Sequence, residues 1–357
     1  MARTMAGNGV LVVASGGLGD AVLLAHVFSR FAALARPGER VSLLLRHDAG
    51  KMAFLFEGSA DVQTVDYDRF ARSFLFRRKT IREIGHARWR LIVNTDFLRH
   101  PKRDEALIKA LAADEKVAMV PRGWAKYDRA LEKNKAIYAR LFDSGPVHLD
   151  KVLRWVRFTD FLTGTNVPPL RLRFSDENLP PPAQTTRPFV LLIPFSAVRE
   201  KQASPELFAE IARAVPDTYD VIVPGAPDDP QRNPDYASLL SLPRVRFEAC
   251  DFERLAGLAR AARLVISVDT AAMHLSVGVG APTLCLASAA YVGEIVPYAT
   301  EIAPPNAHFI YAPMACAGCL GRCVLPLEEN VYACIARLPR ASIVAEVKRL
   351  MAETVPA

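Results

Sequence analysis

Cysteine is scarce in this sequence, and so are long apolar stretches. The 357 residues include six cysteines, too few and too unevenly placed for a disulfide scaffold, so we expect a reducing compartment. Residues 270–293 lack Asp, Glu, Lys and Arg but contain Gly278, Gly280 and Pro282. They therefore predict a buried helix, a turn and a buried strand, not a membrane span. Residues 1–10 show no signal-peptide pattern, and a cytoplasmic protein is expected.

Several familiar ligand-binding motifs are missing as well. The glycine-rich segment 15–20, SGGLGD, follows a strand-like run but fits neither the dinucleotide fingerprint G-x-G-x-x-G nor the phosphate loop G-x-x-x-x-G-K-[ST]. This disfavours a Rossmann oxidoreductase, which stays open as a third hypothesis. No D-x-D pattern is convincingly placed beside the other candidate residues, so no metal is expected in catalysis.

Positive charge is concentrated in the first half of the chain. Residues 1–180 carry 30 basic and 20 acidic side chains, a net charge of +10, whereas residues 181–357 carry 15 and 18, a net charge of −3. This asymmetry predicts an anionic partner for the first half. No helix-turn-helix, zinc-finger or RNP-type pattern accompanies the charge, so nucleic acid is not an expected partner.

The densest basic segment, residues 69–90, has Glu83 as its one acidic residue and apolar side chains between the cations. This composition predicts a basic amphipathic helix near a phosphate-bearing surface, which suits a protein held peripherally on the inner face of a membrane. A solvated helix face is the alternative that the sequence leaves open. The cations are Arg69, Arg72, Arg77, Arg78, Lys79, Arg82, Arg88 and Arg90.

Strand-like apolar runs alternate with helical stretches, which indicates α/β units built on parallel sheets. A proline cluster in residues 165–188 interrupts the alternation and predicts a linker between two such halves. The expected strands are residues 10–14, 41–45, 91–94, 116–120, 189–193, 221–223, 264–268 and 283–287, and the expected helices include residues 20–35, 204–214, 252–262 and 271–279.

Asp20 follows the first glycine-rich turn at the start of a predicted helix. Open α/β sheets bind ligands at the carboxyl ends of their strands, where a carboxylate can serve as a general base. The alternative is that Asp20 only caps the helix.

A second candidate segment is Val268-Asp-Thr-Ala-Ala-Met-His274, at another boundary between strand and helix. Asp269 can cap this helix, and the amides of Thr270, Ala271 and Ala272 can meet a diphosphate at its positive end. His274 lies one turn further on, where it either faces the phosphate or serves as a core histidine bonded to a backbone carbonyl. Lys201, before its own helix, is a second candidate phosphate contact or an ordinary surface lysine.

Together these residues resemble glycosyltransferase family 9, the ADP-heptose:lipopolysaccharide heptosyltransferases. The resemblance rests on Gly19-Asp20 and on residues 268–283, supported in the expected order by Lys201-Gln202, Ser204-Pro-Glu206, Pro224-Gly225 and the Cys316-x-x-Cys319 pair. It implies a GT-B architecture, in which two Rossmann-like domains with parallel sheets face across a cleft. Asp20 matches the family's proposed base, Lys201 its phosphate-binding lysine, and residues 269–274 its donor loop. Ala271 stands where the family usually has glycine.

The resemblance implies an inverting glycosyltransferase that moves a heptose from ADP-heptose to an anionic acceptor such as lipopolysaccharide core. A protein-directed, autotransporter-type heptosyltransferase and a noncatalytic nucleotide-sugar or phosphoglycan-binding protein are the alternatives. We expect an acceptor-side domain over residues 1–180, a nucleotide-sugar-binding domain over residues 181–335, and a helical segment, residues 336–357, that packs back towards the first domain. Catalysis should require no cofactor.

Four cysteines cluster near the end of the chain with the spacing C-x2-C-x3-C-x10-C. Four thiolates can ligate tetrahedral zinc or iron, and glycines between them allow tight turns. The sequence leaves a structural metal site and four reduced, packed cysteines as alternatives. The residues concerned are Cys316, Cys319, Cys323 and Cys334.

Overall fold

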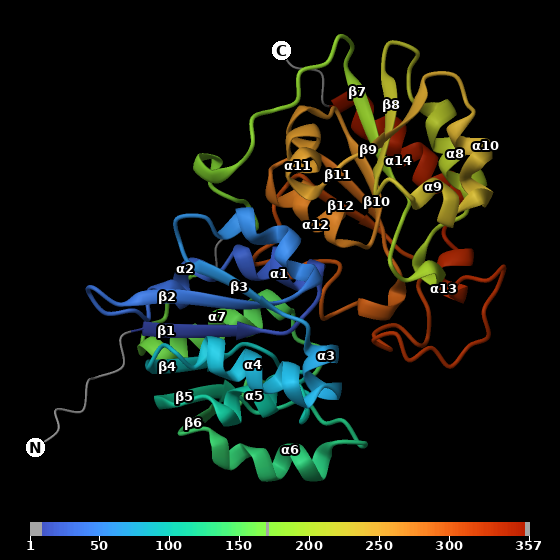
Figure 1. Cartoon of the computed structure of the whole chain (residues 1–357). Coiled ribbons are helices and arrows are strands. Elements are labelled where there is room, and N and C mark those ends of the chain that lie inside the picture. Colours follow the sequence, from blue (N-terminus) through green and yellow to red (C-terminus); the bar gives the residue numbers. More distant parts are fainter. Residues whose placement is uncertain (1–8, 169–170, 354–357) are drawn as a thin grey trace, which may run out of the picture. The chain divides into compact units, whose positions relative to one another are not determined.

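The computed structural model describes residues 9–168 and 171–353, which form two α/β units (Figure 1). The first unit extends to Pro169 and the second begins at Leu170. This division falls inside the proline-rich segment 165–188, a little before the boundary that the sequence suggested after residue 180.

The first unit is built on a six-stranded parallel sheet in the order β3-β2-β1-β4-β5-β6. Its central strand β1 is buried along its whole length, which explains its uninterrupted apolar sequence, because helices cover both faces of a parallel sheet. The chain first adds strands on one side of β1 and then crosses to the other, so the direction of winding reverses between β1 and β4. The strands are β1 (Gly9–Ala14), β2 (Arg40–Arg46), β3 (Asp61–Val65), β4 (Trp89–Asn94), β5 (Ala113–Met119) and β6 (Arg140–Phe142).

Helices α3 (Tyr67–Arg72), α4 (Phe74–Ile84) and α5 (Asp104–Ala110) contribute their apolar side chains to the core on one face of this sheet. Helices α1 (Leu18–Ala25), α2 (Phe28–Ala32) and α7 (Lys151–Thr163) contact one another elsewhere in the unit. The single helix expected over residues 20–35 is therefore wrong: the chain leaves helical geometry at Val27, whose φ is −114° and ψ is 3°. Helix α6 (Asp128–Asn134) follows β5.

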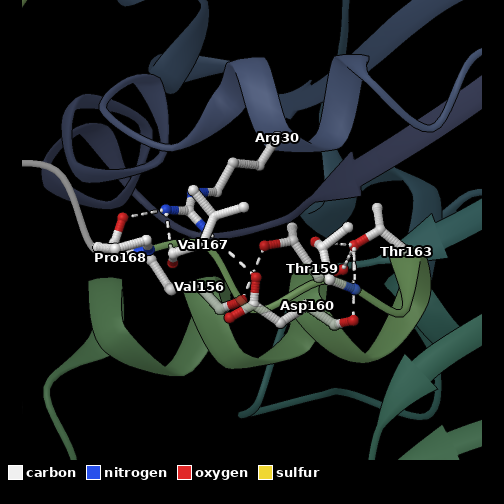
Figure 2. Close-up of polar contacts among 8 residues, drawn as sticks. Arg30, Val156, Thr159, Asp160, Thr163, Val167 and Pro168 are labelled. Carbon is white, nitrogen blue, oxygen red and sulfur yellow. Dashed lines mark hydrogen bonds and ion pairs between the residues drawn. The ribbon is translucent and has the colours of Figure 1, made fainter.

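Arg30 of α2 contacts the C-terminal end of α7 and the residues that follow it (Figure 2). One guanidinium nitrogen lies 3.2 Å from Oδ1 of Asp160, and another donates to the carbonyl oxygens of Val167 and Pro168 at 3.1 and 2.7 Å. The ion pair is largely buried, with side-chain exposures of 12% and 19%. The contact fixes α7 against α2 and thereby helps to position the first residues of α7.

The second unit repeats the design with a parallel sheet in the order β12-β11-β10-β7-β8-β9. Here the winding reverses between β7 and β10. The strands are β7 (Phe189–Ile193), β8 (Asp220–Gly225), β9 (Val245–Ala249), β10 (Val265–Val268), β11 (Thr283–Leu286) and β12 (Ala307–Ile310).

Helix α8 (Pro205–Ala214) begins as the sequence indicates, since the Ser204 hydroxyl accepts from the amide of Leu207 and proline occupies the first helical position. It packs on one face of the sheet together with the last helix, α14 (Arg340–Glu353).

Helices α11 (Phe252–Ala261) and α12 (Ala271–Gly278) lie elsewhere against the sheet. The remaining helices are α9 (Asp229–Arg232), α10 (Ala237–Leu240) and α13 (Ala333–Ala336), and the 3₁₀ segments are η1 (Asp48–Phe56), η2 (Lys135–Ile137), η3 (Asp176–Asn178), η4 (Arg199–Lys201), η5 (Pro234–Tyr236) and η6 (Ala289–Tyr291).

The last helix, α14, contributes to the core of the second unit. Its buried side chains, Ile343, Val347, Leu350 and Met351, belong to that core. The Met351 carbonyl also accepts a hydrogen bond of 2.7 Å from Arg263 in that unit. The apolar side of α14 thus packs against α8 and the second sheet. Within residues 9–168 and 171–353, no helix combines the length and apolar character needed to cross a bilayer.

Candidate functional site

In the first unit, the candidate residues gather where the winding reverses, at the carboxyl ends of β1 and β4. This is the position at which open α/β sheets bind ligands. Asp20 lies in the first turn of α1, just after β1, and Asp96 follows β4. The sequence pattern indicated Asp20 but not Asp96.

Asp20 is held by two hydrogen bonds. Its Oδ2 accepts from the Gly17 amide at 2.7 Å, and its Oδ1 lies 2.5 Å from Nζ of Lys151. A methyl group on Gly16 would come within 2.5 Å of Oδ2, so the turn needs glycine there to let the carboxylate fold back. Asp20 therefore contributes to the cap of α1, as the capping alternative predicted. It also forms an ion pair with Lys151, which is 131 residues away in sequence.

Lys151 reaches Asp20 because it is the first residue of α7. The preceding residue, Asp150, caps the helix through its Oδ1, which accepts from the amides of Val152 and Leu153. One turn later, the Trp155 indole donates to the Thr95 carbonyl at 2.8 Å. That bond ties α7 to the segment that carries Asp96.

Asp96 is a partly buried carboxyl beside this pair. Its Oδ2 accepts from the Ser15 amide at 2.8 Å, which joins the ends of β1 and β4. Burial raises the pKa of Asp96 to about 6; the hydrogen bonds from Ser15 oppose this rise, whereas the negative charge of Asp20 adds to it. The sequence does carry a signal for this residue, because Asp96 follows the predicted strand 91–94 much as Asp20 follows the predicted strand 10–14.

A buried polar network extends from Asn94, the last residue of β4. Asn94 donates to Asp104 and to the Tyr138 hydroxyl, at 3.4 and 3.1 Å, and Tyr138 donates to Glu105. Arg99 and Glu105 form an ion pair of 3.1 Å with side-chain exposures of 1% and 0%. Burial, with the charges of Asp96 and Glu105, raises the pKa of Asp104 to about 8.

In the second unit, the candidate residues lie at the equivalent reversal between β7 and β10. Lys201 ends the η4 turn after β7, and Asp269 follows β10. Their side chains form an ion pair of 2.8 Å and are only 11% and 5% exposed. The Lys201 ammonium also lies 4.7 Å from the Tyr291 ring centroid, so this side chain is enclosed by its neighbours and does not extend into solvent as an ordinary surface lysine does.

Thr270, not Asp269, caps α12. Its hydroxyl accepts from the Met273 amide at 3.4 Å, while Asp269 is engaged by Lys201 instead. Helix α12 begins at Ala271. Its first amides therefore belong to Ala271 and Ala272, two of the residues that the sequence predicted to meet a diphosphate.

His274 lies inside the unit, with a side-chain exposure of 4%. Its Nδ1 is 2.6 Å from the Tyr298 hydroxyl, and its Nε2 is 4.0 Å from Oδ1 of Asp269. The structure therefore places His274 in the core of the second unit, where the Tyr298 hydroxyl is one of its partners. His274 lies behind Asp269, which places it to orient that carboxylate.

The four C-terminal cysteines line a single pocket together with Ala289, Tyr332 and neighbouring side chains. Backbone bonds from the amides of Gly318 and Leu320 to the carbonyls of Ala289 and Ala290, both 2.8 Å, hold the cysteine loop on η6. In the part of the chain that the structure describes, no three His, Cys, Asp or Glu side chains are arranged to hold a metal ion.

Comparison with known proteins identifies a family. The model of glycosyltransferase family 9 (heptosyltransferase) matches residues 114–311. The structure of E. coli heptosyltransferase WaaC with ADP-2-deoxy-2-fluoro heptose aligns at a TM-score of 0.68 and 16% identity, over 97% of this chain and 99% of that one. A glycosyltransferase family 9 protein from Veillonella parvula aligns at 0.68 and 16%, over 99% and 100%.

A third structure is the iron-containing dodecameric glycosyltransferase TibC from enterotoxigenic E. coli. It aligns at a TM-score of 0.52 and 12% identity, over 98% of this chain and 77% of that one. No curated protein sequence gave a significant match. At these identities the alignments show the fold, which is the GT-B arrangement of two α/β units with parallel sheets.

Proposed function

Because the chain belongs to glycosyltransferase family 9, we propose that it transfers a heptose from ADP-heptose to an anionic acceptor, with lipopolysaccharide core as the preferred class, and inverts the anomeric centre. The observation that carries this proposal is the pair of ion-paired sites at equivalent points of the two sheets, Asp20 with Lys151 and Lys201 with Asp269. One supplies a positioned carboxylate, and the other a buried cation beside a helix start.

We assign Asp20 the role of general base. In an inverting transfer, the acceptor hydroxyl attacks the anomeric carbon while a carboxylate takes its proton, and the bond from the anomeric carbon to the diphosphate breaks on the opposite face. A carboxylate offers about four acceptor positions. The hydrogen bond from Gly17 and the ion pair with Lys151 fix its plane, which favours a single direction of proton transfer.

The second unit is assigned the donor. The ammonium of Lys201 and the first amides of α12 supply positive potential for the leaving diphosphate, which carries increasing negative charge as the bond breaks. Asp269 holds Lys201 in place before the donor arrives, and His274 and Tyr298 support Asp269 from within the unit. No metal ion is needed for this step.

The test is a transfer assay with purified protein. ADP release and a mass increase of one heptose on a phosphorylated core acceptor are expected with ADP-heptose. Asp20→Asn should reduce turnover by roughly a hundredfold or more while leaving ADP affinity unchanged. ADP binding without transfer or hydrolysis in the wild-type protein would support a binding protein instead. Transfer to a protein but not to core saccharide would redirect the acceptor assignment.

The C-terminal cysteine pocket is a second, structural proposal. We propose that Cys316, Cys319, Cys323 and Cys334, which line one pocket but are not arranged around an ion here, are drawn together when they bind zinc or iron. Support comes from the chemistry of four thiols on one pocket and from left-handed residues that bend the loop, Gly318, Leu320 and Gly321.

Elemental analysis of protein purified without chelators measures this directly. We expect close to one zinc or iron per chain and a lower melting temperature for Cys319→Ser. Cys250→Ser, in the same unit but away from the pocket, is the matched control and should retain the metal. Metal far below one equivalent, with melting unaffected by Cys319→Ser, would show that the cysteines are simply packed thiols.

A further inference from the structure

The basic segment between β3 and β4 forms an exposed stripe with an unusual composition. We propose that this stripe, Phe74, Leu75, Arg78, Lys79 and Arg82 on α4, docks the protein on an anionic lipid bilayer, with Phe74 and Leu75 inserted among the headgroups. The inference does not depend on the proposed transfer reaction, since it concerns a different surface and binding can be measured without donor.

Helical geometry places the five residues on one side of α4. At 3.6 residues per turn, positions 74, 75, 78, 79 and 82 fall within an arc of roughly 140°, and all five are exposed. The opposite side carries the buried Thr80 and Ile84, which face the core of the first unit. The stripe is therefore the solvent-exposed side of a helix whose other side packs against the core of the first unit.

The apolar part of the stripe sets it apart from an ordinary charged face. Phe74 is 66% exposed and Leu75 is 77% exposed, adjacent to each other in the first turn of α4. Phosphate groups on a soluble glycan would leave these two side chains in water, whereas a bilayer interface accepts them together with the cations.

The neighbouring cations divide into two groups. Arg77 donates to the carbonyls of Phe70 and Ala71 at 3.1 and 2.8 Å, so it braces the junction between α3 and α4. Arg78, Lys79 and Arg82 are exposed instead: the Arg78 guanidinium lies 5.7 Å from the Phe74 ring centroid, and the Lys79 ammonium lies 3.7 Å from the exposed Glu83 carboxylate. The stripe thus keeps a net positive charge, which complements anionic headgroups.

The stripe begins near the sheet edge that carries Asp20 and Asp96. Helix α3 directly precedes α4, and its Asp68 forms an ion pair with Arg103 in the loop after β4. That loop leaves the same sheet edge that carries Asp96 and, after β1, Asp20. The start of α4 therefore lies on the side of the first unit where the proposed base is.

Sedimentation with lipid vesicles tests the proposal on the full chain. Binding to phosphatidylcholine vesicles that contain phosphatidylglycerol, and little binding to pure phosphatidylcholine, is expected. Arg78→Gln with Arg82→Gln should weaken binding roughly thirtyfold, because each cation near an anionic surface contributes on the order of fivefold. Arg213→Gln with Lys348→Gln, two exposed cations of the second unit, is the charge-matched control and should bind like wild type.

Insertion is tested separately. Phe74→Ser with Leu75→Ser should lower the affinity at least tenfold, while Val324→Ser with Leu327→Ser, also exposed apolar residues, should not. A Leu75→Trp variant should show fluorescence quenching by brominated lipids. Equal binding to neutral and anionic vesicles, or no loss with the α4 variants, would overturn the proposal. So would concentration-dependent self-association that the Ser variants abolish in the absence of vesicle binding, since α4 would then be a contact between copies.

Discussion

At the residue scale, the donor assignment depends most on Lys201. Its ammonium is buried against Asp269 and the Tyr291 ring. An exposed lysine elsewhere on the protein could not supply a positive charge at this enclosed position. We expect Lys201→Ala to weaken ADP binding by about 1.5–3 kcal/mol, the scale of a charge-assisted hydrogen bond. Isothermal titration calorimetry measures this, with the exposed Arg213→Ala as the control. Unchanged ADP affinity would remove Lys201 from the donor site.

Asp104 gives a prediction about pH. Its pKa is raised to about 8 by burial, so between about pH 4 and 8 the folded protein holds a proton that the unfolded chain releases. The free energy of unfolding should therefore fall as the pH rises through this window, by about 1 kcal/mol per pH unit. Urea unfolding at pH 5, 6.5 and 8 tests the slope. In Asp104→Asn the dependence should flatten, and an equally steep slope in that variant would assign it to other groups.

At the element scale, the position of α7 depends on both of its ends. Lys151 contacts Asp20 at its start, and Arg30 clamps Asp160 near its end (Figure 2). Arg30→Met removes an ion pair and two hydrogen bonds to carbonyls, and we expect it to lower the free energy of unfolding by about 2–4 kcal/mol. Chemical denaturation measures the loss.

The same variant should also reduce turnover more than ADP affinity, since α7 orients the base and not the donor loop. Arg69→Met, which removes an exposed arginine of the same unit, serves as the control. A stability equal to wild type would show that the hydrophobic contacts of α7 suffice to fix it.

At the scale of the whole molecule, charge is distributed unequally along the chain. The first 180 residues carry a net charge of +10 and the rest −3. If the first half attracts an anionic acceptor, raising the salt concentration should raise the KM for the acceptor several-fold, because exposed charges are screened beyond about 8 Å at physiological ionic strength. Steady-state kinetics at low and high salt measure this. The value of kcat should change little, and an acceptor KM independent of salt would contradict electrostatic attraction.

The sequence by itself determined the family, the α/β class and the central strands of both sheets. The expected strands at residues 10–14, 41–45, 91–94, 189–193 and 283–287 are confirmed within one or two residues. These strands are covered by helices on both faces, so nearly every position is apolar and the signal survives without knowledge of the neighbours. The candidate residues Asp20, Lys201 and Asp269 could be named because each follows such a strand.

Only the tertiary structure decided the edges and the partners. The four strands missing from the sequence analysis, β3, β6, β9 and β12, are the outer strands of the two sheets. They are only partly buried and mix polar with apolar residues, so their sequences carry no continuous hydrophobic run. Similarly, Lys151 meets Asp20 across 131 residues, and Tyr298 meets His274 across 24. Such pairs depend on how helices and loops pack around the strand ends, and no local spacing encodes that.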